Sequence, residues 1–138
     1  MIYNFFKYLT TEFPAEKFYV NNKIIISGET EVDDRMIILI EQPGERQPWF
    51  GLITTNIQVL VRDNDGPGAR SLAYKIYNKI IDDAEFGKIL PAETVGGVLF
   101  PAIQIDQITP FGPPQSLGMN EEKKAEFTSN YKIIYRRT

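Results

Sequence analysis

Residues 61–80, VRDNDGPGARSLAYKIYNKI, contain the end of an apolar run, a glycine-containing turn and an amphipathic stretch. Before the turn, apolar and polar residues alternate across GLITTNIQVLVRD, a period typical of a strand with one buried face. The predicted buried positions are Ile53, Ile57, Val59 and Val61, and the predicted polar ones are Thr54, Asn56, Gln58 and Arg62. After the turn, apolar residues recur every three or four positions from Ala69 to Ile80. This spacing predicts a helix against the sheet, which ends within DDAEFG, where Gly87 can close it.

The turn itself, Asp63–Gly68, raises the question of a ligand site. A phosphate loop needs a lysine followed by serine or threonine, or three spaced glycines, and DNDGPGARS has neither pattern. DNDG resembles the middle of a calcium-binding EF-hand loop, but Val61 and Leu72 occupy the positions of the first ligand and of the bidentate glutamate. A weak surface cation site at this corner stays open.

A purely structural corner explains the same residues better. Pro67 suits the first turn of a helix, where its missing N–H costs nothing. Asp63 and Asp65 precede that turn and are expected to accept its unpaired backbone N–H groups. Arg62 and Arg70 flank the two aspartates, so the corner is also a candidate salt-bridged surface for a partner.

The remainder of the chain supplies a second helix and more strands. Apolar residues at helical spacing predict an amphipathic helix closed by Pro14, with Ile2, Phe5, Phe6 and Leu9 in the core. KIIIS and RMIILIEQ indicate two strands around the polar turn GETEVDD. The segment EQPGERQPWFG is too rich in proline and glycine for regular structure, which places Arg46, Gln47, Trp49 and Phe50 on or beside a loop.

The last third predicts further strands. Pro101 in GGVLFPAIQIDQIT indicates an edge strand or a bulge, TPFGPPQSLG is expected to be irregular, and MNEEKK is expected to form a solvated tip. The final segment alternates, with Tyr131, Ile133 and Tyr135 on one side. We therefore predict one α+β domain over residues 1–138, a mixed, largely antiparallel β-sheet with two main helices packed on one face.

Composition excludes several kinds of chemistry. The chain has no cysteine and no histidine, which excludes thiol nucleophiles, disulfides and the common catalytic dyads and metal centres. Adjacent carboxylates point in different directions, so Asp33–Asp34 and Asp82–Asp83 do not form an acid–base pair. A net charge of −3 disfavours a nucleic-acid binder. We expect no enzyme, no cofactor, no metal, no membrane span and no signal peptide, in a chain that folds in the cytoplasm.

Three stretches carry a resemblance: IQVLVRDNDGPGARSLAYKIYNKI, GGVLFPAIQIDQITP and PPQSLGMNEEKKAEFTSNYKIIYRR. In the order of their predicted elements and in short sequence motifs, from about residue 50 to the end, they resemble the tail-terminator and minor capsid proteins of long-tailed bacteriophages. That resemblance implies a non-enzymatic ring, commonly of six subunits, that caps the finished tail tube and presents a surface to the head connector. The implied partners are copies of the chain, the tail tube protein and the head–tail connector protein. DNA is implied only as passing cargo, and the implied location is the tail–head junction of the virion after assembly in the host cytoplasm.

Ring closure needs two different surface patches. An aromatic loop with arginine has the composition of an interface anchor, and an acidic corner can meet a basic surface. The candidate interface residues are Arg46, Trp49, Phe50, Arg62, Asp63, Asp65 and Arg70. The alternative for Trp49 is a place over the edge of the core. Two other functions stay open: a head-side connector or minor capsid subunit, and a small cytoplasmic domain that binds a ligand or cation at Asp63–Gly68.

Overall fold

A computed structural model of the chain describes residues 1–20, 35–42, 46–47, 51–83, 88–120 and 123–138. The elements are α1 (Ile2–Glu12), β1 (Phe18–Val20), β2 (Arg35–Gln42), β3 (Arg46–Gln47), β4 (Leu52–Asp63), α2 (Gly66–Asp82), β5 (Lys88–Leu90), β6 (Glu93–Val95), β7 (Val98–Phe100), β8 (Ile103–Pro110), β9 (Gln115–Met119) and β10 (Ala125–Arg137). Their order confirms the predicted α+β class.

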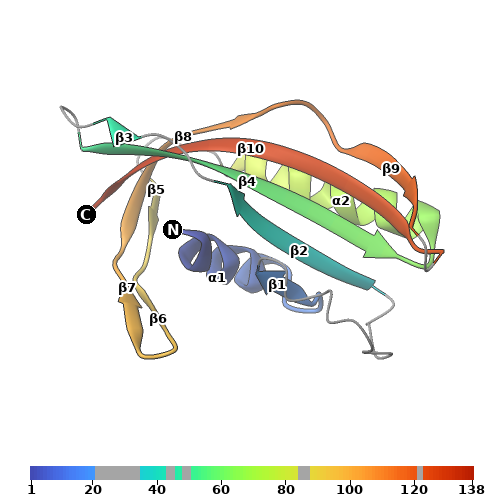
Figure 1. Cartoon of the computed structure of the whole chain (residues 1–138), viewed down its shortest axis with the longest axis horizontal. Helices are drawn as coiled ribbons and strands as arrows, with labels where there is room; N and C mark the ends of the chain where they lie inside the picture. Colours follow the sequence, from blue (N-terminus) through green and yellow to red (C-terminus); the bar gives the residue numbers. More distant parts are fainter. Residues whose placement is uncertain (21–34, 43–45, 48–50, 84–87, 121–122) are drawn as a thin grey trace.

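Two long antiparallel strands, β4 and β10, form the centre of the sheet (Figure 1). Their register extends from Asp63 opposite Ala125 to Ile53 opposite Tyr135. On the other side of β4 lie β2 and the short β3, and β1 pairs with β2 in parallel. On the other side of β10 lie β8 and β9, and β5 pairs with β8. The remaining strands, β6 and β7, form a separate hairpin. Because β1 and β2 are parallel and the other pairs of the main sheet are antiparallel, that sheet is mixed and largely antiparallel, as predicted.

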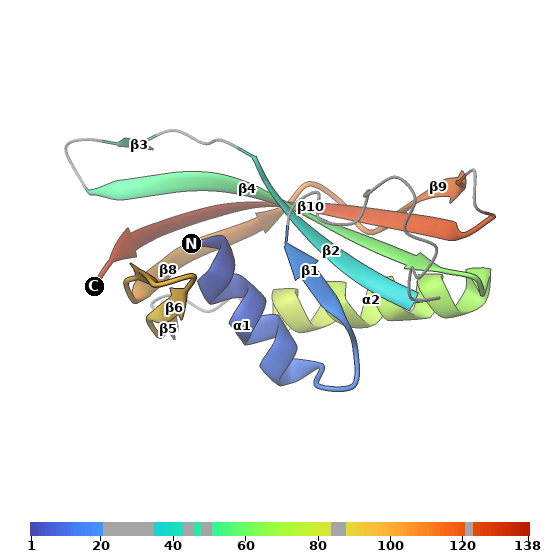
Figure 2. The ribbon, with the colours of Figure 1, turned by 60° about the horizontal axis from the view of Figure 1, so that its bottom comes forward.

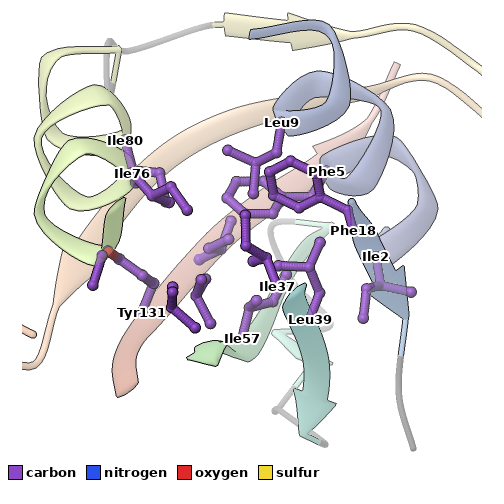
Figure 3. Packing of buried hydrophobic residues seen from close by; sticks show 14 of the residues in the cluster. Ile2, Phe5, Leu9, Phe18, Ile37, Leu39, Ile57, Ile76, Ile80 and Tyr131 are labelled. Atoms are coloured by element: carbon purple, nitrogen blue, oxygen red, sulfur yellow. The ribbon is translucent and has the colours of Figure 1, made fainter. Parts of the chain in front are cut away.

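Both helices pack against the same face of the sheet and share one core (Figure 2). Figure 3 shows α1 side chains and α2 side chains meeting over the strands. Fully buried members include Phe5, Leu9, Ile57, Ile76, Ile80, Tyr131 and Ile133. Each such aliphatic or aromatic side chain contributes about 1.5–3 kcal/mol through its removal from water. The predicted alternation of buried and exposed residues in β4 and β10 is thus confirmed, although Ile53 is only half-buried. In α1, Phe6 is also only half-buried, whereas Ile2, Phe5 and Leu9 are buried as predicted.

The opposite face is polar apart from a small cluster. Met36, Ile38 and Leu60 are buried there. Elsewhere on this face, cross-strand pairs dominate: Gln58 donates to Thr128 across 2.8 Å, and ion pairs join Arg62 to Glu126 and Arg136 to Asp106. Facing pairs of this kind stabilise a sheet modestly and neutralise its charges.

The expectation that TPFGPPQSLG is irregular is wrong in its second half. Pro113 and Pro114 precede β9, so neither removes a hydrogen-bond donor from it. Opposite β9, Phe127 pairs with Ser116 and Glu126 pairs with Gly118, which leaves Leu117 as the extra residue of a bulge. Gly118 has φ +80°, a conformation that a glycine adopts without strain.

Pro101 divides the predicted run into two strands. A turn with Gly96 and Gly97 at positive φ joins β6 to β7, and β8 begins two residues after the proline. The prediction that MNEEKK forms a solvated tip is also partly wrong, because Lys124 at its end is only 7% exposed. KIIIS, GETEVDD, Trp49, Phe50, Gly87 and two glutamates of the tip lie outside the described residues.

Candidate functional site

The corner between β4 and α2 is held by an arginine from a neighbouring strand. Asp63, 7% exposed, accepts a hydrogen bond from Arg35 Nε at 2.8 Å and another from the backbone N–H of Asp65 at 3.1 Å. Arg35 also contacts Glu16 at 3.2 Å and the carbonyl of Gly68 at 3.4 Å. The hydrogen bond that Arg35 donates to Asp63 raises the pKa of Arg35, whose guanidinium therefore stays charged. Both oxygens of Asp63 are already in use within the fold.

Space at this corner is equally limited. A Cβ on Gly68 would lie 2.8 Å from Asp65 Oδ2 and 3.2 Å from both Arg35 Nη2 and Asp63 Oδ2. Pro67 lies in the first turn of α2, as predicted, but the predicted side-chain cap is wrong. Asp65 is the N-cap residue without a side-chain cap bond, and the Asp63 carboxylate accepts from Arg35 and from the Asp65 N–H rather than from the first turn of α2. The geometry is that of a packed corner.

The other predicted interface residues have scattered positions. Arg62 donates to Glu126 on β10 at 2.6 and 2.8 Å, on the polar face of the sheet. Arg70 is exposed and lies 5.8 Å from the centre of the Tyr74 ring. Arg46 belongs to β3, where the structure describes the backbone but not the side chain. Since Trp49 and Phe50 lie outside the described residues, the predicted aromatic anchor stays a prediction.

A charged cluster joins both helices to β5. Tyr8 donates to Asp83 Oδ2 at 2.6 Å, and Lys79 and Lys88 lie 3.3 and 3.5 Å from the same oxygen. The hydrogen bond from Tyr8, followed by the two lysines, lowers the pKa of Asp83. Burial, and then the bond to Asp83, raise the pKa of Tyr8. Asp83 is thus a structural carboxylate rather than half of an acid–base pair with Asp82.

Two exposed apolar patches emerge only from the structure. The hairpin patch consists of Val95, Val98 and Leu99, of which Leu99 is 64% exposed. The β9 patch consists of Phe111, Leu117 and Met119, which are 65%, 55% and 64% exposed. In Figures 1 and 2 these patches lie at opposite ends of the molecule, with β6 at one end and β9 at the other.

A sequence signal for these patches exists in the charge pattern. Residues 94–120 contain one charged side chain, Asp106, where the 24% charged fraction of the whole chain would place about six. Asp106 itself is paired with Arg136 at 2.6 Å. Interface cores are depleted in charge, so a long uncharged stretch that remains exposed is a candidate contact surface.

A groove of about 450 Å³ lies between α1, β1 and β6. Tyr3, Phe6, Phe18 and Tyr19 contribute to its lining together with Lys7 and Glu93. The neighbouring Asn4 side chain is buried, and its amide donates to the carbonyls of Pro91 and Pro101 at 2.9 and 3.2 Å. This bond pair attaches both ends of the β6–β7 hairpin to α1.

The part of the chain that the structure describes has no cluster of three acidic residues suited to a metal ion. Neither α1 nor α2, within those described residues, is long and apolar enough to cross a membrane. Comparison with models of known protein families finds no match, and comparison with curated proteins finds none either.

Proposed function

We propose that this protein is a non-enzymatic structural subunit that forms a ring with copies of itself, caps the completed tail tube of a long-tailed bacteriophage and helps to join tail to head. One observation carries the ring: two different exposed, uncharged apolar patches lie at the two ends of the molecule. Between them, β8 spans eight residues, about 26 Å at about 3.3 Å per residue. Head-to-tail assembly requires two unlike patches of this kind on every subunit.

The corner Asp63–Gly68 supports a structural role rather than a ligand site. Its buried carboxylate is bonded to Arg35 and to a backbone N–H, and a Cβ on Gly68 would come close to the side chains of Asp65, Arg35 and Asp63. These contacts fix α2 on the sheet and thereby the core beneath the patches.

The polar face of the sheet suits a subunit past which DNA moves as cargo. Two of its arginines are neutralised by cross-strand partners, Arg62 by Glu126 and Arg136 by Asp106. Paired arginines release few counterions from a phosphate backbone, and the chain carries a net charge of −3. The proposed partners are therefore proteins: copies of this chain, the tail tube protein and the head–tail connector protein.

Deletion of the gene in a phage that carries it tests the proposal by electron microscopy of the lysate. Overlong or unsealed tails without heads, restored to normal by a plasmid copy, are expected. Tails of normal length beside separate filled heads would instead assign the protein to the head-side connector. Normal virions would overturn the structural role, as would absence of the protein from purified virions by mass spectrometry.

A further inference from the structure

The β6–β7 hairpin is attached to the main sheet at one end only. Leu90 of β5 and Ile103 of β8 are register partners and are each 2% exposed, so both belong to the core. Residues 91–102 leave the sheet between them, and none of these residues is buried. β6 and β7 pair with each other in a separate two-stranded sheet, and Figure 1 shows them extending away from the main sheet. A hairpin without a buried face is marginally stable alone, so its position depends on contacts with the rest of the fold.

Both connections of the hairpin to the main sheet are short and contain a proline. Pro91 directly follows β5, and Pro101 directly follows β7. Because a proline has no backbone N–H, neither position can donate a hydrogen bond that would continue the ladder of the main sheet into the hairpin. Next to Pro101, the carbonyl of Ala102 accepts a hydrogen bond from the Thr138 N–H at 3.2 Å, which fixes that end of β8. Movement of the hairpin can therefore concentrate in these two connections.

Asn4 on α1 bridges both connections. Its side chain is 1% exposed, and its amide donates to the carbonyl of Pro91 at 2.9 Å and to that of Pro101 at 3.2 Å. An apolar contact accompanies these bonds, between the rings of Tyr3 and Phe100 at a centroid distance of 4.8 Å. Asn4 Oδ1, however, is buried without a hydrogen-bond partner among the described residues, a cost that water would remove if the hairpin moved away. Two hydrogen bonds thus hold the hairpin on α1, and one unpaired oxygen opposes them.

We propose that the β6–β7 hairpin is a hinged arm that the Asn4 amide latches onto α1, and that the latched arm is the dominant state. While it is latched, Glu93 and Val95 of the arm line the groove of about 450 Å³ together with aromatic side chains of α1 and β1. Release of the latch widens this groove and changes the direction in which the hairpin patch points. One buried side chain therefore sets both features. The inference is independent of the phage role, because it concerns movement within one subunit.

The absence of cysteine from the chain allows spin labels to be attached at chosen positions of the full-length protein. Their separation is then measured by double electron–electron resonance. The arm pair consists of Leu99→Cys on β7 and Lys75→Cys on α2, and the reference pair consists of Lys75→Cys and Lys132→Cys on β10. All three positions are exposed. With natural Asn4, each pair is expected to give one dominant, narrow distance.

Removal of the two donors should release the arm. Asn4→Ala and the similarly sized Asn4→Leu are both expected to raise the ratio of released to latched arm about tenfold. Each net hydrogen bond is worth about fivefold, and relief of the unpaired oxygen offsets part of the loss by removing a cost of the latched state. The arm pair should then gain a second or broader distance, while the reference pair stays unchanged. Asn78→Ala, at an exposed position of α2, is the matched control and should alter neither pair.

Three results would overturn the inference. An arm-pair distance that stays narrow in both Asn4 variants would show that Asn4 is no latch. Broadening with Asn4→Ala but not with Asn4→Leu would assign the effect to lost packing rather than to lost hydrogen bonds. A change in the reference pair as well would show that the hairpin does not move separately from the rest of the fold.

Discussion

Removal of one hydroxyl group, by Tyr8→Phe, should expose the contribution of the charged cluster between the helices. The phenylalanine ring can keep the packing of Tyr8 against Phe5, 5.7 Å between centroids, and its place below Lys88, 4.6 Å from the ring centre. Only the 2.6 Å bond to Asp83 is lost. A hydrogen bond to a charged group is worth about 1.5–3 kcal/mol, and partial exposure of Asp83 reduces this to about 1–2 kcal/mol.

The loss should depend on pH in a defined direction. Because the pKa of Asp83 is lowered in the folded state, its contribution to the free energy of unfolding is fully present above its unfolded value. It disappears as the pH falls through the lowered folded value, below about pH 4. Since the pKa of Tyr8 is raised, its hydroxyl stays protonated and the effect should be constant from about pH 6 to pH 9.

Urea denaturation at pH 7 and near pH 2.5 measures both quantities. Tyr8→Phe should lower the midpoint at pH 7 without changing the slope, and the difference from the natural chain should be smaller in acid. Tyr74→Phe is the matched control, because the Tyr74 hydroxyl has no hydrogen-bond partner among the described residues. An equal loss at both pH values, or no loss at pH 7, would refute the reasoning.

Three further outcomes test the core and the corner. Ile76→Ala removes a fully buried side chain and should cost about 2–5 kcal/mol in chemical denaturation, against less than about 0.5 kcal/mol for the exposed Asn78→Ala. Arg35→Ala leaves the buried Asp63 with one backbone donor and should lower the free energy of unfolding by about 2 kcal/mol. A double variant with Asp63→Asn should recover part of this loss, and fully additive effects of the two substitutions would contradict the pairing. A calcium site at the corner with a Kd of about 10 μM would stabilise the fold by about 2.7 kcal/mol in hundredfold excess of calcium. Because both oxygens of Asp63 are already bonded, we expect an unchanged melting temperature, and a rise that Asp63→Asn removes would contradict this.

Local periodicity explains why much of the fold could be predicted from the sequence. The alternation ending in Val61 and the three-and-four spacing from Ala69 to Ile80 each reflect one buried face, and both elements form as predicted. Proline position was harder to interpret. Pro101 separates two strands and Pro113 precedes one, so the same residue type that argued against regular structure marks where strands begin or end.

The contacts of the corner could not be derived in the same way. Asp63 pairs with Arg35, 28 positions earlier, because the register of β2 on β4 places them opposite each other. That register follows from the packed sheet rather than from either strand alone. Arg62 and Arg70, the neighbours in sequence, therefore point to other partners.

The apolar patches were missed for a different reason: their sequences look like core strands. The residues VLF in β7 and LG in β9 have a composition that is typical of buried segments. Only the packing of the fold shows that no described element covers them. The low charge of residues 94–120, which contain only the paired Asp106, agrees with a contact surface, but the buried strand β4 lies in a similarly uncharged stretch, so this signal alone does not separate the two cases.

The backbone beneath both patches is fixed before any partner arrives. Phe111 is bonded to β10 and followed by Pro113, and the buried Asn4 holds both ends of the hairpin on α1. At these described positions, association therefore has mainly side chains to order, at about 0.5–1.5 kcal/mol for each immobilised side chain. Exposed apolar side chains on a rigid backbone add little to the stability of the subunit, whereas they lower the cost of binding. This lower cost is the physical ground on which we propose that the chain acts in assembly through its two ends rather than through its glycine corner.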